Sequence, residues 1–251
     1  MEHLLTGGNV AGEVVRVGAT VRKPGTPATP AVEALLTHLG ERGFPGAPRT
    51  LGRDERGRHV LEHVPGALAD TLPPLTLPEL HRLGALVREL HDAAADFRPP
   101  ADVQWQVVLP PDREELVCHG DLAPWNLVRH GERWVFIDWD GAGPGSRLWD
   151  LAYAAHGFVP LHAGGDPAVD APRLRALVDG YGLDVQQRRE LPALVVAHVR
   201  GMYDLLRRSA DTGEQPWARL WAEGHGDHWG PAADYAEQHR ERWTAALLEE
   251  R

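Results

Sequence analysis

Short runs of alternating apolar and polar residues at the start of the chain are typical of β-strands. Two such regions cover residues 4–23 and 51–64, and glycines punctuate both, with Gly57 at the turn of the second. Between them, apolar residues recur at helical spacing over 30–39, and Gly43 follows as a stop signal. The pattern therefore predicts a small antiparallel sheet with one helix packed on it.

The pattern changes to helical spacing after the proline-rich residues 65–74. Apolar residues fall on one face of a predicted helix over about 78–94. Two short apolar runs, 115–118 and 133–137, each end at a polar cluster, and most of 173–251 again has helical periodicity. We therefore expect a mostly helical second half that is interrupted by two short strands.

These patterns predict an α+β fold of two lobes, with the boundary after Gly66. Residues 1–66 would form a small lobe, an antiparallel sheet with one helix, and residues 67–251 would form a larger and mostly helical lobe. A chain of 251 residues is long enough to bury two cores of that size.

Composition indicates a globular protein that does not bind nucleic acid. Hydrophobic residues make up 43% of the chain and charged residues 25%, which are ordinary proportions for a globular protein. The formal net charge is -10, whereas binding to nucleic acid phosphates requires clustered Lys and Arg. A cationic or neutral small molecule is easier to accommodate as a partner, and the oligomeric state is left open between monomer and homodimer.

Cysteine content and hydropathy indicate the compartment. Cys118 is the single cysteine, so no disulfide can form within the chain, and a reducing compartment is favoured. Residues 1–10 lack the pattern of a signal peptide, and no stretch approaches the roughly 20 apolar residues of a membrane span. We expect a cytoplasmic protein that has no membrane partner.

Two polar clusters carry the candidate chemistry. The first reads His-Gly-Asp-Leu-Ala-Pro-Trp-Asn over 119–126, and the second reads Ile-Asp-Trp-Asp over 137–140, after a short hairpin. Phosphoryl transfer needs a carboxylate beside the attacking hydroxyl and oxygen ligands that hold Mg²⁺ against the phosphates. Asp121, Asn126 and Asp138 supply those groups if the hairpin returns the chain to the loop. The competing interpretation is a plain turn in which the aspartate caps the backbone.

The two clusters resemble the motifs of the aminoglycoside phosphotransferase and choline kinase-like family, H-G-D-x-x-x-x-N and I-D-x-[DEG], in the same order and spacing. The resemblance implies a protein kinase-like fold and an ATP-dependent, or GTP-dependent, kinase of small molecules. It also implies that Asp121 is the catalytic base and that Asn126 and Asp138 are ligands of Mg²⁺. Gly120 and Ala123 stand where protein kinases have arginine and lysine, so a protein substrate is disfavoured.

The nucleotide would bind in the first lobe. The glycine-rich turn around Gly8 could give backbone donors to the phosphates. We assign the cation to Lys23, with Arg22 as the competitor, because strand alternation lets only one of them face the site. The resemblance further suggests Glu33 as the acidic partner of that cation. The segment from Glu62 to Val64 would then connect the lobes and meet the adenine through its backbone.

The resemblance places acceptor recognition in the C-terminal helices and assigns Asp150 to bracing the catalytic loop. Acids and aromatic residues there would suit an aminated acceptor, and the sequence does not rank them. The candidates are Asp204, Asp211, Glu214, Trp217, Trp221 and Glu223.

Two alternatives to an active kinase remain open. One is a catalytically inactive nucleotide-binding protein on the same fold. The other is a metal-dependent hydrolase built on histidines, since His225, Asp227 and His228 could bind a metal ion. We interpret this second His-Gly-Asp as a loop, because Ala232 stands where the asparagine of the first motif would be.

Overall fold

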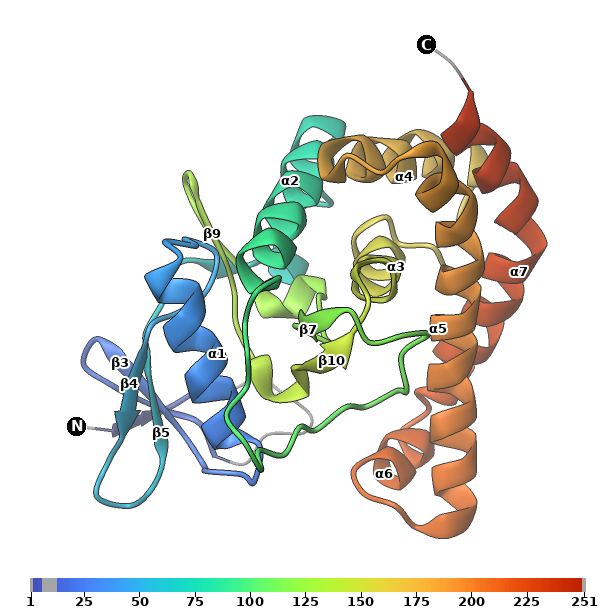
Figure 1. The fold of residues 1–251 in the computed structure, drawn as a ribbon. Coiled ribbons are helices and arrows are strands. Elements are labelled where there is room, and N and C mark those ends of the chain that lie inside the picture. Colours follow the sequence, from blue (N-terminus) through green and yellow to red (C-terminus); the bar gives the residue numbers. More distant parts are fainter. Residues whose placement is uncertain (1, 6–12, 250–251) are drawn as a thin grey trace. The chain divides into compact units, whose positions relative to one another are not determined.

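The computed structural model describes residues 2–5 and 13–249 (Figure 1). The strands are β1 (Glu2–Leu4), β2 (Val15–Val17), β3 (Thr20–Lys23), β4 (Thr50–Arg53), β5 (His59–Glu62), β6 (Ala67–Leu68), β7 (Leu116–Cys118), β8 (Leu127–His130), β9 (Arg133–Phe136) and β10 (Gly143–Gly145). The α-helices are α1 (Thr29–Glu41), α2 (Leu77–Ala94), α3 (Arg147–Phe158), α4 (Pro167–Tyr181), α5 (Val185–Thr212), α6 (Trp217–Ala222) and α7 (Gly226–Leu248). Three short 3-10 helices are η1 (Ala69–Thr71), η2 (Pro124–Asn126) and η3 (Trp139–Gly141).

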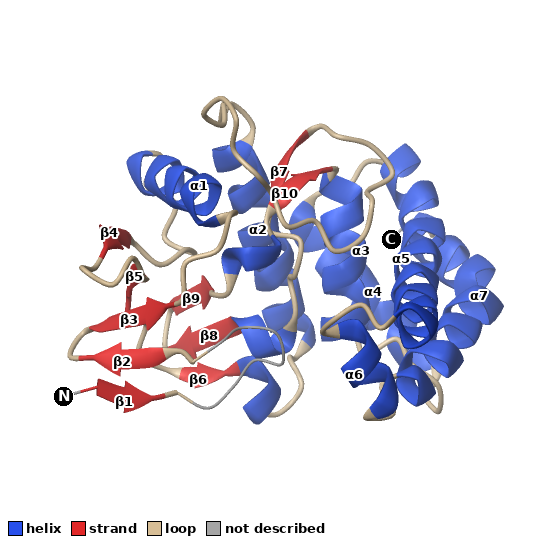
Figure 2. Ribbon diagram, turned by 90° about the horizontal axis from the view of Figure 1, so that it is seen from below, coloured by secondary structure: helices blue, strands red, loops and turns tan. Residues whose placement is uncertain are grey.

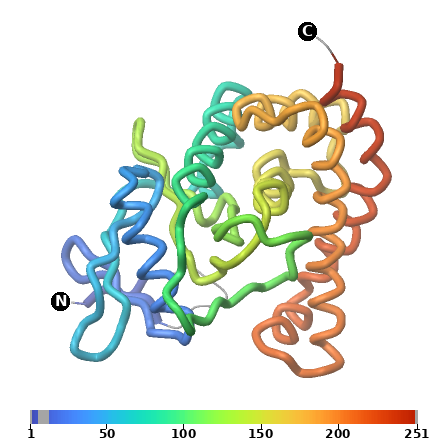
Figure 3. Tube along the Cα trace, in the orientation of Figure 1, coloured from blue at the N-terminus to red at the C-terminus, as the bar shows by residue number. Residues whose placement is uncertain are grey.

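The chain folds into two compact units that do not follow the sequence order. The first unit comprises residues 1–73, 90–108 and 115–144, and the second comprises 74–89, 109–114 and 145–251. The course of the chain through both can be followed in Figure 3. The units are defined by contacts between residues and do not test where one lobe ends. The lobe boundary expected after Gly66 therefore stays a prediction.

The first unit is built on an antiparallel sheet with strand order β1-β2-β3-β5-β4 (Figure 2). Helix α1 follows β3 and contacts β4, and its apolar side, which includes Leu35 and Leu39, is fully buried. In the register of the sheet, Lys23 at the end of β3 lies opposite His59 on β5. This arrangement confirms the predicted sheet with its single helix.

A smaller sheet, β6-β8-β9, and the short pair β7-β10 complete the strands of the first unit. The chain leaves β7 at Cys118, forms a loop that ends in η2, and enters β8 directly after Asn126. The hairpin between β8 and β9 then returns the chain, with Leu127 opposite Phe136. Short strand pairing therefore brings the two polar clusters of the sequence back to the same end of one hairpin.

The second unit is helical, as the periodicity of 173–251 predicts. Helix α5 packs against α3, α6 and α7, and α4 packs against α7. Side chains cap the helices: Ser146 Oγ accepts the Trp149 N–H at the start of α3, and Asp184 and Gln187 form a capping box on α5. None of the described helices is both long and apolar enough to cross a lipid bilayer.

One prediction in this unit is wrong. His225, Gly226 and Asp227 are not part of a loop, because α7 begins at Gly226 with His225 at its N-cap. Glycine is required there, since a Cβ on Gly226 would lie 2.6 Å from the ring of Trp221. Within the described part of the chain, the side chains of His225, Asp227 and His228 do not gather at metal-ligand distance.

Candidate active site

The loop after β7 holds Asp121 through Asn126. Asn126 is only 4% exposed, and its Nδ2 donates to the Asp121 Oδ2 at 2.8 Å and to the Asp121 carbonyl oxygen at 3.0 Å. These bonds turn the amide nitrogen of Asn126 toward Asp121. The Asn126 Oδ1 accepts no hydrogen bond from another described residue, so it remains available as an oxygen ligand.

The segment after β9 runs beside this loop. The Ile137 N–H donates to the Asn126 carbonyl oxygen at 2.8 Å, which fixes the position of the next residue, Asp138. Asp138 has a left-handed backbone, with φ 60° and ψ 66°, a conformation that costs a non-glycine residue about 1 kcal/mol. Its carboxylate thus projects from a tight turn that opens η3.

His119 connects the two segments. The ring is completely buried and lies 4.4 Å from the Trp139 ring and 5.7 Å from the Phe136 ring, between ring centroids. Its Nδ1 accepts the Asp121 N–H at 3.2 Å, so the ring proton is on Nε2, which donates to the Ile137 carbonyl oxygen at 3.1 Å. The imidazole therefore fixes the backbone of Asp121 relative to the backbone that precedes Asp138.

Gly120 makes this close approach possible. Its φ is +77°, and a Cβ added there would lie 2.1 Å from the carbonyl oxygen of Gly141. A side chain at this position would therefore separate the loop from η3. This contact explains why glycine, and not the arginine of protein kinases, stands between His119 and Asp121.

Lys23 joins the aspartates from the sheet. Its side chain is buried, and its Nζ lies 2.5 Å from the Asp138 Oδ1 and 2.8 Å from the Asp140 Oδ2. Burial alone would lower the pKa of Lys23, but the charges and hydrogen bonds of Asp138 and Asp140 outweigh it, so the pKa is raised. The ammonium group is therefore charged and shared between two carboxylates.

The alternation of β3 separates Lys23 from Arg22. Arg22 instead lies 3.7 Å from the Asp54 carboxylate and donates to the Thr20 hydroxyl. Of these two basic residues, only Lys23 therefore contacts Asp138 and Asp140, because neighbouring residues of a strand point to opposite faces.

Asp140 is a site residue to which the sequence analysis gave no role. It stands at the last position of the I-D-x-[DEG] pattern, and that position was a usable signal. It lies in η3, two residues after Asp138, and its Oδ2 is 2.8 Å from the Lys23 Nζ, so both carboxylates contact the same ammonium group.

The structure does not bring Glu33 to Lys23. Both oxygens of Glu33 accept from Arg53, from Nε and from Nη2, each at 2.9 Å. Helix α1 contacts β4, where Arg53 lies, and the fork of a guanidinium fits a carboxylate at two points. Glu33 therefore faces the edge of the sheet in this structure, and its expected role at the nucleotide stays a prediction.

Glu62 and Val64 occupy the connection after β5. The Glu62 side chain is held by Arg133 at 2.9 Å and by the Arg49 N–H at 3.2 Å, and its own N–H donates to the Arg49 carbonyl oxygen at 2.8 Å. Val64 makes no backbone hydrogen bond with another described residue, and Pro65 has no N–H. Gly8, the remaining predicted nucleotide contact, lies outside the described residues.

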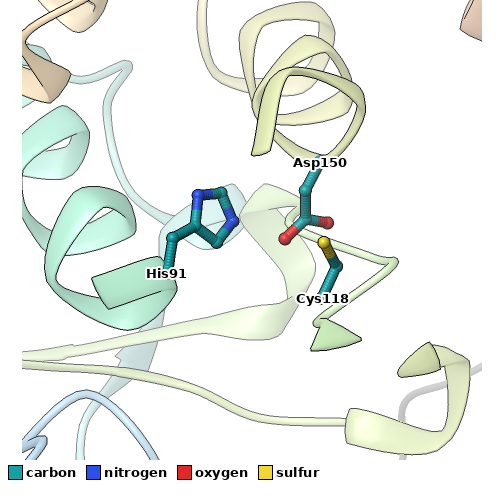
Figure 4. Close-up of side chains that lie close together, drawn as sticks. All are labelled: His91, Cys118 and Asp150. Atoms are coloured by element: carbon teal, nitrogen blue, oxygen red, sulfur yellow. The ribbon is translucent and has the colours of Figure 1, made fainter. Parts of the chain in front are cut away.

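Cys118 of the first unit and Asp150 of the second are both buried. Figure 4 draws these two side chains and that of His91. Cys118 ends β7, directly before the loop that holds Asp121. His91 of α2, in the same unit, is fully buried. Asp150 lies in the first turn of α3 in the second unit, where a carboxylate is favoured by the helix dipole. The expectation that Cys118 is simply a buried residue is consistent with its 5% exposure.

An antiparallel sheet that carries a buried lysine, a loop with aspartate and asparagine, and a second loop with aspartate together define the class of protein kinase-like phosphotransferases. Comparison with known proteins agrees. Residues 103–194 match the phosphotransferase enzyme family. The trifolitoxin immunity protein of Rhizobium leguminosarum bv. trifolii is 32% identical over 262 residues, which cover 98% of this chain and 98% of that protein. The chain belongs to the phosphotransferase enzyme family.

Solved structures show the same fold at low sequence identity. A choline/ethanolamine kinase family protein from Mesorhizobium loti has a TM-score of 0.66 at 18% identity, and the match covers 99% of this chain and 92% of that one. An amicoumacin kinase in complex with AMP-PNP, Ca²⁺ and Ami has a TM-score of 0.66 at 13% identity, with 96% and 88% covered. The predictions of a kinase-like α+β fold and of membership in a family of small-molecule kinases are confirmed.

Proposed function

We propose that the protein transfers the γ-phosphoryl group of ATP, with GTP as the alternative donor, to a hydroxyl group of a small molecule. One observation carries the proposal: Asp121, Asn126 and Asp138 are held at one junction by hydrogen bonds, and Lys23 meets Asp138 there. A plain turn would need none of these long-range contacts, whereas phosphoryl transfer needs a base, metal ligands and a cation gathered at one place.

Asp121 would accept the proton of the attacking hydroxyl. Its carboxylate is oriented by the Asn126 amide and its backbone by His119, so the base is in place before the acceptor arrives. Ordering both ends of the residue avoids a loss of conformational freedom during the reaction. The protein would therefore orient the reacting groups, while the bonds that form and break are those of the transferred phosphoryl group.

Oxygen ligands suit Mg²⁺, and the free Oδ1 of Asn126 and the carboxylate of Asp138 fit that requirement. At these residues Mg²⁺ would supply positive charge that offsets the negative charge developing on the phosphates. Asp140 is a further carboxylate within reach of the same ammonium group. Lys23 would contact the α- and β-phosphates as its bonds to the aspartates are exchanged for bonds to the nucleotide.

Val64 would recognise the base of the nucleotide. Its backbone N–H and C=O are unpaired among residues 13–249, and they form a donor and an acceptor in a part of the chain that is only half-buried. Glu62 would hold this connection in place through Arg133. Glu33 would act only if its bonds to Arg53 were given up.

A catalytically inactive nucleotide-binding protein is the second candidate. Only turnover separates it from the kinase, because both would bind nucleotide at the same residues. Because the relative at 32% identity is a trifolitoxin immunity protein, trifolitoxin is one acceptor to include. The assay is therefore ADP or GDP release over a panel of aminated alcohols, aminoglycosides and trifolitoxin.

We expect Asp121→Asn to lower turnover by about 10² to 10⁴-fold, because a general base of this kind contributes that much. Nucleotide affinity should change by less than about threefold, since the side chain keeps its size and its bond to Asn126. Calorimetric titration with AMP-PNP measures the affinity. Asp227→Asn, in the second His-Gly-Asp, is the matched control and should retain full turnover. Full turnover by Asp121→Asn would disprove the mechanism.

A further inference from the structure

Trp125 is an exposed aromatic side chain in a loop whose other apolar residues are buried. It is 45% exposed, whereas Leu122 and Ala123 are fully buried and the next residue, Asn126, is 4% exposed. Trp125 has no hydrogen bond or ring contact with any other residue that the structure describes. The exposed part of its indole is therefore open to contact with a ligand.

Asp70 lies on the neighbouring turn. The 3-10 helix η1, which contains it, packs against η2, which contains Trp125, and both belong to the first unit. The turn is anchored by buried Ala69 and by the bond from the Thr71 hydroxyl to the Leu68 carbonyl oxygen at 2.7 Å. Asp70 is exposed and has no hydrogen bond or ion pair within residues 2–5 and 13–249.

An indole face and a carboxylate on adjacent turns suit an organic ammonium group. The ring attracts the cation through its quadrupole, and the carboxylate pairs with it by charge. The peptide group of Trp125 is directly joined to that of Asn126, whose side chain bonds Asp121. Trp125 thus belongs to the same loop as Asp121, and the inference requires that an amino alcohol with its ammonium group on Trp125 places its hydroxyl at this base.

We propose that Trp125 and Asp70 bind the ammonium group of an aminated acceptor and so determine specificity for the acceptor. The inference rests on the proposed kinase function and narrows it to acceptors that carry an amine. It also differs from the sequence-based expectation that acceptor contacts come only from the C-terminal helices. The main competing role is contact with the nucleotide, by stacking of a base on Trp125 or by a ribose hydroxyl on Asp70.

The test compares charged and neutral acceptors in the full-length protein. ADP release is measured with choline and ethanolamine and with the neutral carbon analogue of choline, for the wild type and three variants: Trp125→Ala, Trp125→Phe and Asp70→Asn. Val169→Ala and Glu55→Gln are matched controls, because these residues are exposed and lie on α4 and on the turn between β4 and β5. Melting temperatures confirm that each variant is folded.

We expect Trp125→Ala to raise the KM of the amines about tenfold, the effect of losing one desolvated cation–π contact. Trp125→Phe should stay within about threefold because the ring face is kept, and Asp70→Asn should raise the same KM about threefold to tenfold. The KM of ATP and the rate with the neutral analogue should be unchanged in all three variants. Both control variants should match the wild type.

Three results would overturn the inference. The first is a raised KM for ATP with an unchanged KM for the amines, which would assign the pair to the nucleotide. The second is equal turnover of charged and neutral acceptors. The third, if no probe is turned over, is the absence of choline binding by calorimetry in the presence of AMP-PNP. Failure of the kinase proposal would give a different result, because no acceptor would then cause ADP release.

Discussion

Lys23 illustrates how two opposing effects decide the state of one residue. Its side chain is almost fully buried, which favours loss of the proton, but Asp138 and Asp140 lie at 2.5 and 2.8 Å and favour the charged form more strongly. The raised pKa means that Lys23 remains an ammonium group throughout the physiological range. Any cation that binds Asp138 must therefore compete with it.

Lys23→Met should make Mg²⁺ alone bind more tightly, with a Kd at least about threefold lower, because the competing ammonium group is gone. The KM of ATP should rise in the same variant, because the phosphates lose a cation. Calorimetric titration with MgCl2 and steady-state kinetics measure the two effects. Arg22→Met is the matched control, since its guanidinium lies beside Asp54 and not beside Asp138. Unchanged Mg²⁺ affinity in Lys23→Met would contradict the competition.

At the scale of elements, the site depends on two loops that approach each other more closely than side chains would allow. The loop that holds Asp121 contacts η3 at Gly120 and Gly141, and the His119 ring bonds both segments through its two nitrogens. Both segments are ends of short strands, so the sheets set their positions. The junction is thus a property of β7, β8 and β9 together.

Gly120→Ala should destabilise the protein by about 1–3 kcal/mol more than Gly131→Ala and should strongly reduce kcat/KM. Both glycines have a positive φ, +77° and +54°, so both substitutions carry the backbone penalty of about 1 kcal/mol. Only Gly120 also meets another atom, because nothing lies within 4 Å of a Cβ at Gly131. Urea unfolding of the two variants isolates the contact, and equal losses of stability would show that the approach to Gly141 is unimportant.

Sequence periodicity predicted the elements that are long or regular, namely α1, α2 and the β4–β5 hairpin. It missed β6 and β10, because strands of two or three residues are too short to show alternation. The second His-Gly-Asp was misinterpreted because the fit of Gly226 against the Trp221 ring is a tertiary contact. The grouping around Asp121 could be predicted because a loop and one hairpin fix it, whereas the contact of Lys23 with Asp138 spans 115 residues.

At the scale of the whole molecule, buried histidines connect stability to pH. His198 on α5 packs between Trp149 and Tyr153, with ring centroids 4.8 and 4.6 Å away, and burial lowers its pKa to about 4. Burial likewise lowers the pKa of His156 to about 3, and the nearby His228 and His198 add to the effect. Both imidazoles are therefore neutral in the folded protein at neutral pH.

Stability should fall as the pH drops from about 6.5 toward 4, because the unfolded chain binds a proton at His198 that the folded protein excludes. Between pH 6.5 and 5 this one residue accounts for about 2 kcal/mol. His198→Leu should reduce the difference in the free energy of unfolding between pH 7.5 and 5 by that amount, as measured with urea. His130→Leu, at an exposed position, is the control. An unaltered pH dependence in His198→Leu would show that His198 is not responsible.

The left-handed backbone of Asp138 limits which substitutions the chain tolerates at that residue. Glycine, asparagine and aspartate are the residues that accept such a φ at small cost, so most replacements would disturb the turn as well as remove the charge. Asparagine is the exception, because it would keep the turn and remove the negative charge. If Asp138 binds Mg²⁺ as proposed, this one conservative substitution would give a folded protein that binds nucleotide without transferring its phosphate.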